Sequence, residues 1–116
     1  MKTVIVKIDP KKPDVKRLAY PASVLRGGGL VAFPTETVYG LGANAYNEFA
    51  IEKIFLAKDR PKDNPLIVHI ADRSVVSQIA KEIPTKAKKL MDKFWPGPLT
   101  VVLKKTARVP KIITAG

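Results

Sequence analysis

Polar side chains that can bind a ligand or move a proton follow directly after one apolar segment. The segment Leu30–Phe33 ends at Pro34, and the polar residues come next: Thr35, Glu36, Thr37 and Tyr39. Gly40 and Gly42 follow, and glycine lets a backbone turn tightly or approach a ligand closely. A buried strand with polar groups at its carboxyl end is how open α/β sheets build ligand sites. An ordinary polar turn fits the same pattern, with Glu36 as either a general base or an exposed acid.

Two cations, Lys58 and Arg60, stand two residues apart after a predicted helix. If the chain is extended there, both side chains point the same way. They would then suit a triphosphate or a leaving pyrophosphate, because arginine grips two phosphate oxygens and lysine acts as a point charge. The alternative is that Lys58 complements the helix dipole while Arg60 is solvated.

His69 is the one histidine, and it lies inside the apolar segment Leu66–Ile70. Its ring either lines a pocket or is a satisfied polar group of the core. Trp95 and Phe94 indicate core or turn packing, with stacking on a base as the alternative. The absence of cysteine excludes thiol nucleophiles, disulfides and Cys-ligated zinc, and a single histidine argues against a His-based metal site. P-loop and dinucleotide-binding motifs are also absent, so a nucleotide would bind in another way.

Alternating strand and helix patterns must position these groups. Strands are predicted at Thr3–Ile8, Leu30–Phe33, Leu66–Ile70 and Leu99–Leu103. Helices are predicted from Asp14 to about Arg26, over Phe49–Lys58 with Asn47 as the N-cap, from Asp72 or Ser74 to Ala80, and from Pro84 to Phe94. Pro21 should kink or split the first helix, and three glycines end it. The fold class is therefore α/β or α+β, with a sheet that the chain leaves incomplete.

The length and net charge of the sequence limit the classes of protein to which it can belong. The 116 residues suit a single domain, and the sequence has no apolar run long enough for a membrane span and no signal peptide. Together with the lack of cysteine, this fits a cytoplasmic protein. The net charge is +11, and Lys81–Lys111 holds nine Lys or Arg against two acids. Such an excess favours nucleotides, pyrophosphate or RNA as partners, although a solvated lysine-rich surface is the alternative.

Four segments taken in order resemble the YrdC/Sua5 family. They are Phe33–Leu41 (FPTETVYGL), Ile54–Pro61 (IFLAKDRP), Asn64–Ile70 (NPLIVHI) and Phe94–Thr100 (FWPGPLT). The resemblance implies a twisted mixed sheet with flanking helices and a concave, positively charged cleft. It also implies a nucleotidyltransferase, threonylcarbamoyl-AMP synthase, that converts L-threonine, bicarbonate and ATP to threonylcarbamoyl-AMP and pyrophosphate. That product serves the threonylcarbamoyl modification of adenosine-37 in tRNA.

The resemblance also assigns roles to particular residues. Lys58 and Arg60 match a K-x-R pair that holds the ATP phosphates. The threonine and adenylate pocket would include Thr35, Tyr39, His69 and Asn64, with Asn64 in the turn that follows the pair. No protein nucleophile and no protein metal site are implied, and Mg²⁺ would arrive with ATP. A downstream threonylcarbamoyl transferase and tRNA or double-stranded RNA are the further partners expected.

One departure from the family pattern is a missing S-x-N motif. No Ser-x-Asn occurs, and the serines are Ser23, Ser74 and Ser77. We therefore expect residues 1–116 to be an N-terminal part of the catalytic domain, without the C-terminal domain of Sua5-type members, and weakly active or inactive alone. Two alternatives stay open: a basic RNA-binding module without catalysis, and a carbamoyl-transfer domain like that of hydrogenase maturation proteins.

Overall fold

Helix α1, Val15–Arg26, is the first regular element of the computed structural model, which describes residues 2–116. Asp14 begins it as predicted, because its carboxylate accepts a hydrogen bond from the Lys16 backbone N–H at 2.9 Å. Gly28, at a positive φ of 84°, lies in the turn that ends it. The predicted split at Pro21 is wrong, since the helix continues through that residue. A proline at position 21 removes one backbone hydrogen bond, the one to the carbonyl of Arg17 four residues earlier. The helical turn around Arg17 is exposed.

A β-hairpin carries the first polar cluster. Strand β1, Val31–Pro34, pairs antiparallel with β2, Tyr39–Gly42, with Pro34 opposite Tyr39. The sequence predicted only the first strand, because the two glycines of β2 have low strand propensity. They are accommodated because the Phe33 ring lies across them: a Cβ atom on Gly42 would stand 2.9 Å from its Cε1 atom.

Helix α2, Glu48–Lys58, anchors the first of two apolar cores. The predicted cap is confirmed, since Asn47 Oδ1 accepts from the Ala50 N–H at 3.1 Å. The buried side chains of this core come from α2 and from the chain's last helix, α5 (Lys111–Thr114), and its approach: Ile51, Phe55, Val109 and Ile113. Lys53 Nζ donates to Gly28 O at 2.9 Å, which ties α2 to the turn after α1.

The second core lies in the other half of the chain. A 3-10 turn, Arg73–Val75, leads into α3, Val76–Ile79, and Asp72 caps the turn. Strand β3, Ala80–Lys81, pairs antiparallel with β4, Lys104–Lys105, and helix α4, Thr85–Phe94, lies between them in sequence. The buried residues of this core are Val76, Ala80, Ala87 and Met91. The predicted helices are therefore confirmed, and β4 and α5 are additions in a tail where no element was predicted.

Three predicted strands are extended but unpaired. Thr3–Ile8, Leu66–Ile70 and Leu99–Leu103 form no ladder among residues 2–116, so the expected single mixed sheet divides into two antiparallel pairs. Leu66–Ile70 still alternates between half-buried and exposed side chains, as a strand does. A strand needs a neighbouring chain segment to accept and donate its backbone hydrogen bonds. In Leu66–Ile70 only the Leu66 N–H has such a partner, and it donates to Ile113 O at 2.9 Å. The α+β class itself is confirmed.

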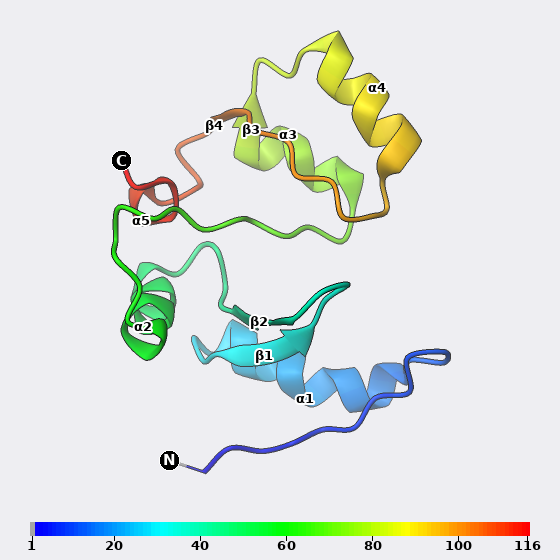
Figure 1. Cartoon of the computed structure of the whole chain (residues 1–116), viewed down its shortest axis with the longest axis vertical. Coiled ribbons are helices and arrows are strands. Elements are labelled where there is room, and N and C mark those ends of the chain that lie inside the picture. The colour runs from blue at the N-terminus through cyan, green and yellow to red at the C-terminus, as the bar shows by residue number, and fades with distance from the viewer. Residues whose placement is uncertain (1) are drawn as a thin grey trace.

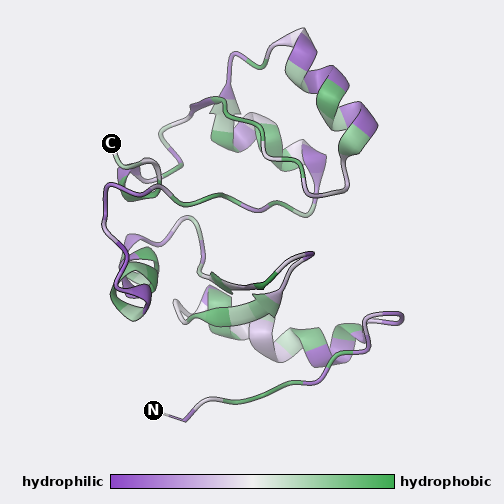
Figure 2. Cartoon of the chain, in the orientation of Figure 1, coloured by the Kyte–Doolittle hydropathy of each residue, from purple (hydrophilic) through white to green (hydrophobic). Residues whose placement is uncertain are grey.

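The elements form an open arrangement (Figure 1). The hairpin and α1 lie at one end, α3 and α4 lie at the other, and the extended segment after α2 runs between them. The radius of gyration is 15.2 Å, against about 13 Å for a compact domain of this length. Hydrophobic residues occur along the extended segments (Figure 2), and Val102 in one of them is 94% exposed. No helix within residues 2–116 is long and apolar enough to cross a membrane.

Candidate active site

Thr35 closes the turn of the hairpin. Its Oγ1 accepts from the backbone N–H groups of Thr37 at 3.3 Å and Val38 at 3.2 Å, and its hydroxyl donates to Val38 O. The hydroxyl therefore shapes the loop that joins the two strands. Tyr39 begins β2 with 75% of its surface exposed, so its phenol is available to a ligand. Glu36 is an exposed loop acid.

His69 lies against the hairpin. Its ring meets the Phe33 ring edge to face, with centroids 5.7 Å apart and planes at 78°. Its Nδ1 is 3.2 Å from Ile67 O, which can accept a hydrogen bond from a protonated Nδ1. The side chain is exposed, which excludes the interpretation of His69 as a buried polar group of the core.

The chain does not run straight from Lys58 to Arg60, so the extended backbone expected there is wrong. Asp59 caps α2 in the left-handed region, at φ 48° and ψ 42°, because its N–H and that of Arg60 bond back to the last helical turn. Lys58 is exposed in that last turn. The chain therefore bends between Lys58 and Arg60. The rule that side chains two residues apart in an extended strand point the same way does not apply to them.

Arg60 is half-buried and holds the following loop, so it is not the solvated side chain of the alternative interpretation. Its Nε donates to Asn64 O at 3.1 Å. Its Nη2 donates to Asn64 Oδ1 at 2.9 Å and to Pro65 O at 2.6 Å. The guanidinium therefore fixes the turn that the sequence marked at Asn64 and Pro65.

The structure thus brings the predicted site residues together in two groups. One is the hairpin with His69, and the other is Arg60 with Asn64. Among the hydrogen bonds, ion pairs and ring contacts within residues 2–116, none joins the two groups directly. Leu66–Ile70 connects them along the chain, since it begins just after Pro65 and contains His69.

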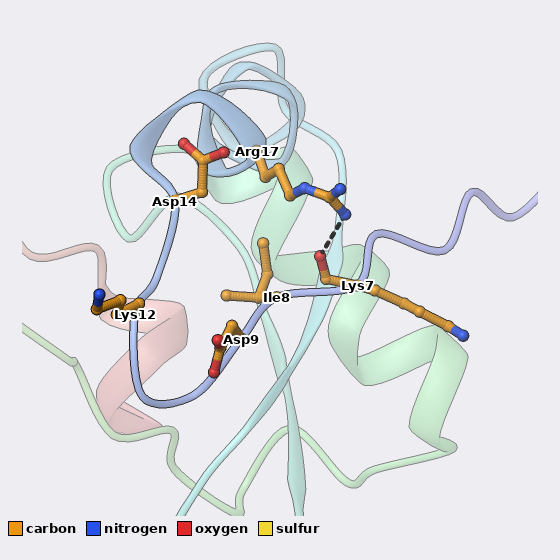
Figure 3. A pocket seen from close by; sticks show the side chains of 6 residues that line it. All are labelled: Lys7, Ile8, Asp9, Lys12, Asp14 and Arg17. Atoms are coloured by element: carbon orange, nitrogen blue, oxygen red, sulfur yellow. Dashed lines mark hydrogen bonds between the residues drawn. The ribbon is translucent and has the colours of Figure 1, made fainter.

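The cavities of the structure lie elsewhere. The larger, of about 420 Å³, is lined by the N-terminal segment and the start of α1 (Figure 3), with Ile8 central and Lys7 and Lys12 pointing outward. Arg17 Nη1 donates to Lys7 O there at 3.0 Å. The smaller, of about 140 Å³, lies between α3 and α4. Neither of these two cavities is lined by a predicted site residue.

Three aromatic residues have roles that the sequence left open or missed. Trp95 packs in a turn, because its Nε1–H donates to Leu99 O at 2.9 Å and its ring contacts the second core. Phe94 is 49% exposed, with Lys93 Nζ 5.6 Å from its ring centroid. Phe33 was missed as the residue that places His69. Gly40 and Gly42, which stand two residues apart in the strand opposite Phe33, are the sequence pattern that indicates an aromatic ring lying across the hairpin.

Comparisons with known proteins show which family the chain resembles. A model of the Sua5/YciO/YrdC family, described as telomere recombination, matches residues 23–116. Threonylcarbamoyl-AMP synthase of Pyrococcus abyssi is 53% identical over 114 residues, which cover 98% of this chain and 33% of that protein. The Bacillus subtilis threonylcarbamoyl-AMP synthase is 56% identical over 102 residues, or 86% of this chain and 29% of that protein.

A solved structure extends the likeness to the backbone. The crystal structure of P. abyssi Sua5 complexed with L-threonine matches with a TM-score of 0.94 at 52% identity, covering 98% of this chain and 33% of that one. The chain therefore spans about a third of the length of these relatives and follows their fold closely over that third.

Proposed function

The chain belongs to the Sua5/YciO/YrdC family, and from that membership we propose that it is the part of a threonylcarbamoyl-AMP synthase that binds L-threonine and the ATP phosphates. The similarity to synthases over nearly the whole chain carries the proposal. The reaction would join L-threonine, bicarbonate or carbon dioxide, and ATP, and release pyrophosphate. The product would pass to a threonylcarbamoyl transferase acting on tRNA, and we propose the cytoplasm as the location of the enzyme.

The chemistry needs no nucleophile from the protein. The threonine amine loses a proton and attacks the carbon of carbon dioxide, which gives N-carboxy-threonine. A carboxylate oxygen of that group then attacks the α-phosphorus of ATP, and the bond to the β-phosphate oxygen breaks. The protein contributes alignment and charge: Tyr39 and His69 contact threonine, and Lys58 and Arg60 stabilise the pyrophosphate as it leaves.

Mg²⁺ would enter this site with the nucleotide. Within residues 2–116 no group of three or more His, Cys, Asp or Glu side chains is placed to hold a metal ion. Lys58 and Arg60 suit the phosphates rather than a cation, so we assign the ion to ATP oxygens and water. When bound, it would neutralise charge on the phosphates.

RNA is proposed as a second partner on the strength of charge. The net charge of +11 supports attraction to a phosphate backbone, and the excess is concentrated from α4 to α5. Binding of this kind weakens steeply as salt rises. If Lys58→Ala and Arg60→Ala weakened RNA binding and left nucleotide binding unchanged, the RNA-binding module would be favoured over the enzyme.

The test of the proposed function is pyrophosphate release that depends on both L-threonine and bicarbonate. We expect the 116-residue chain to be weakly active or inactive, and a chain extended with the S-x-N segment to be active. Lys58→Ala or Arg60→Ala should remove that activity, while Lys62→Ala, an exposed loop lysine beside them, should not. Equal rates for the two chains would contradict the expected dependence on the S-x-N segment. Release without threonine would contradict the function.

A further inference from the structure

Arg60 has few N–H groups left for a ligand. A guanidinium carries five N–H donors. Nε uses its one donor on Asn64 O, and Nη2 uses both of its donors, on Asn64 Oδ1 and Pro65 O. Only the two N–H groups of Nη1 have no partner among the hydrogen bonds of residues 2–116. The two-nitrogen fork of Nε and Nη2, which arginine usually offers to a phosphate, is occupied by the protein itself.

The three acceptors also determine the direction of the guanidinium. All of them come from Asn64 and Pro65, and the Asn64 N–H itself donates to Pro61 O at 3.0 Å. At its other end, the Arg60 backbone N–H is held by Phe55 O at 2.9 Å. The side chain is therefore fixed at both ends before any ligand arrives, with Nη1 as its free edge.

We propose that Asn64 is a positioning residue for Arg60, and that Arg60 offers its Nη1 edge alone to the pyrophosphate part of ATP. This inference rests on the proposed function, because it takes Arg60 to bind phosphate. Asn64 then acts through Arg60 and does not touch the adenylate, in contrast to the substrate contact that the sequence predicted for it. Lys58, exposed one residue before the bend at Asp59, supplies a second and mobile charge.

The probe that separates the possibilities is inorganic pyrophosphate, titrated into the 116-residue chain by calorimetry. Asn64→Ala should weaken its binding about tenfold, since an acceptor for a charged donor is lost and the guanidinium is free to rotate. Asn64→Asp should also weaken it, because a carboxylate would neutralise Arg60. Asp63→Ala, in the same exposed loop, is the control and should not weaken binding. AMP, which lacks the pyrophosphate, should bind wild type and Asn64→Ala equally.

A double-mutant cycle tests whether Asn64 acts through Arg60. In a chain that already carries Arg60→Ala, the Asn64→Ala change should have no further effect on pyrophosphate affinity. The Arg60 Nε–H resonance, observed by ¹⁵N NMR, should be protected from exchange in the wild type and broadened in Asn64→Ala, while circular dichroism reports an unchanged fold.

The outcomes distinguish a failure of this inference from a failure of the proposed function. Additive effects of Asn64→Ala and Arg60→Ala, or unchanged affinity in Asn64→Ala, would overturn the inference while Arg60 kept its role. Pyrophosphate binding that is absent, or that is unaffected by both Lys58→Ala and Arg60→Ala, would overturn the proposed function and the inference with it.

Discussion

The contact between Phe33 and His69 joins the hairpin to the Leu66–Ile70 segment of the proposed threonine site. Neither residue is buried, so their edge-to-face packing depends on the hairpin holding Phe33 over its two glycines. Gly42 has no room for a side chain there. The identity of a residue outside the ligand pocket therefore decides where a proposed ligand-binding ring lies.

Phe33→Leu should displace the His69 ring and lower the affinity for L-threonine several-fold, because the aromatic contact contributes roughly 0.5–1.5 kcal/mol. The His69 ring-proton shifts in NMR spectra would report the loss directly. Phe49→Leu is the matched control, since Phe49 is 81% exposed and has no ring contact with His69. Unchanged His69 shifts in Phe33→Leu would show that Phe33 does not position the ring.

At the residue scale, the carboxyl group of Asp72 makes the stability of the turn at Arg73–Val75 depend on pH. The Ser74 backbone N–H, which its Oδ1 accepts at 2.9 Å, holds the Asp72 pKa below its ordinary value of 3.8. A carboxylate with a depressed folded pKa stabilises the fold above the unfolded pKa and loses that effect as the pH falls through the folded pKa. We therefore expect the turn at Arg73–Val75 to loosen only as the pH falls below 3.8.

The ¹³C shift of the Asp72 carboxyl, followed during an acid titration, measures this pKa. Asp72→Asn keeps an acceptor oxygen but cannot titrate, so the protection of the Ser74 amide, relative to its intrinsic exchange rate, should no longer fall as the pH drops. A titration midpoint at or above 3.8 in the wild type would contradict the structure.

Helices and extended segments differ in how far the sequence determines them. The sequence predicted these helical starts because a capping side chain and the backbone N–H group that it accepts from lie within three residues of each other. The capping residues are Asp14, Asn47 and Asp72. Leu66–Ile70 and Leu99–Leu103 have the composition of strands, yet strand formation depends on a distant neighbour that the local pattern does not encode. The hairpin partner β2 was missed for the opposite reason, since its pairing overrides its poor propensity.

The same difference applies to the site. The residues of the site were identified from motifs, but the bend at Asp59 was not, because a non-glycine residue in the left-handed region has no strong sequence signal. The engagement of Arg60 by Asn64 and Pro65 follows from that bend. The roles of the site residues therefore stay predictions, and the contacts between Arg60 and Asn64 came from the structure alone.

Helix α2 is the element that positions the cations, and its cap is a direct test of that dependence. Asn47→Ala should lower the free energy of unfolding by about 1 kcal/mol, because the Ala50 N–H loses its acceptor. Urea unfolding followed by circular dichroism measures the loss. Asn47→Asp keeps the acceptor and should restore most of the stability. Equal destabilisation by both substitutions would show that the amide acts through another contact.

At the scale of the whole molecule, two separate cores meet along the segment that carries His69. The first core lies under α2 and the start of the Leu66–Ile70 segment, and the second lies under α3 and α4. Ile70 contacts the second core while Leu66 and Val68 contact the first, so the segment that carries His69 spans both. That residues 1–116 form a single domain stays a prediction.

The most direct test of the central claim is a ¹⁵N NMR map of the 116-residue chain titrated with L-threonine. The account predicts that the shifts of Thr35, Tyr39 and His69 move together with one dissociation constant, while the resonances of α4 stay in place. Serine in place of threonine should cause smaller shifts of the same residues. The absence of any shift at Tyr39 and His69, with changes confined to other residues, would contradict the account.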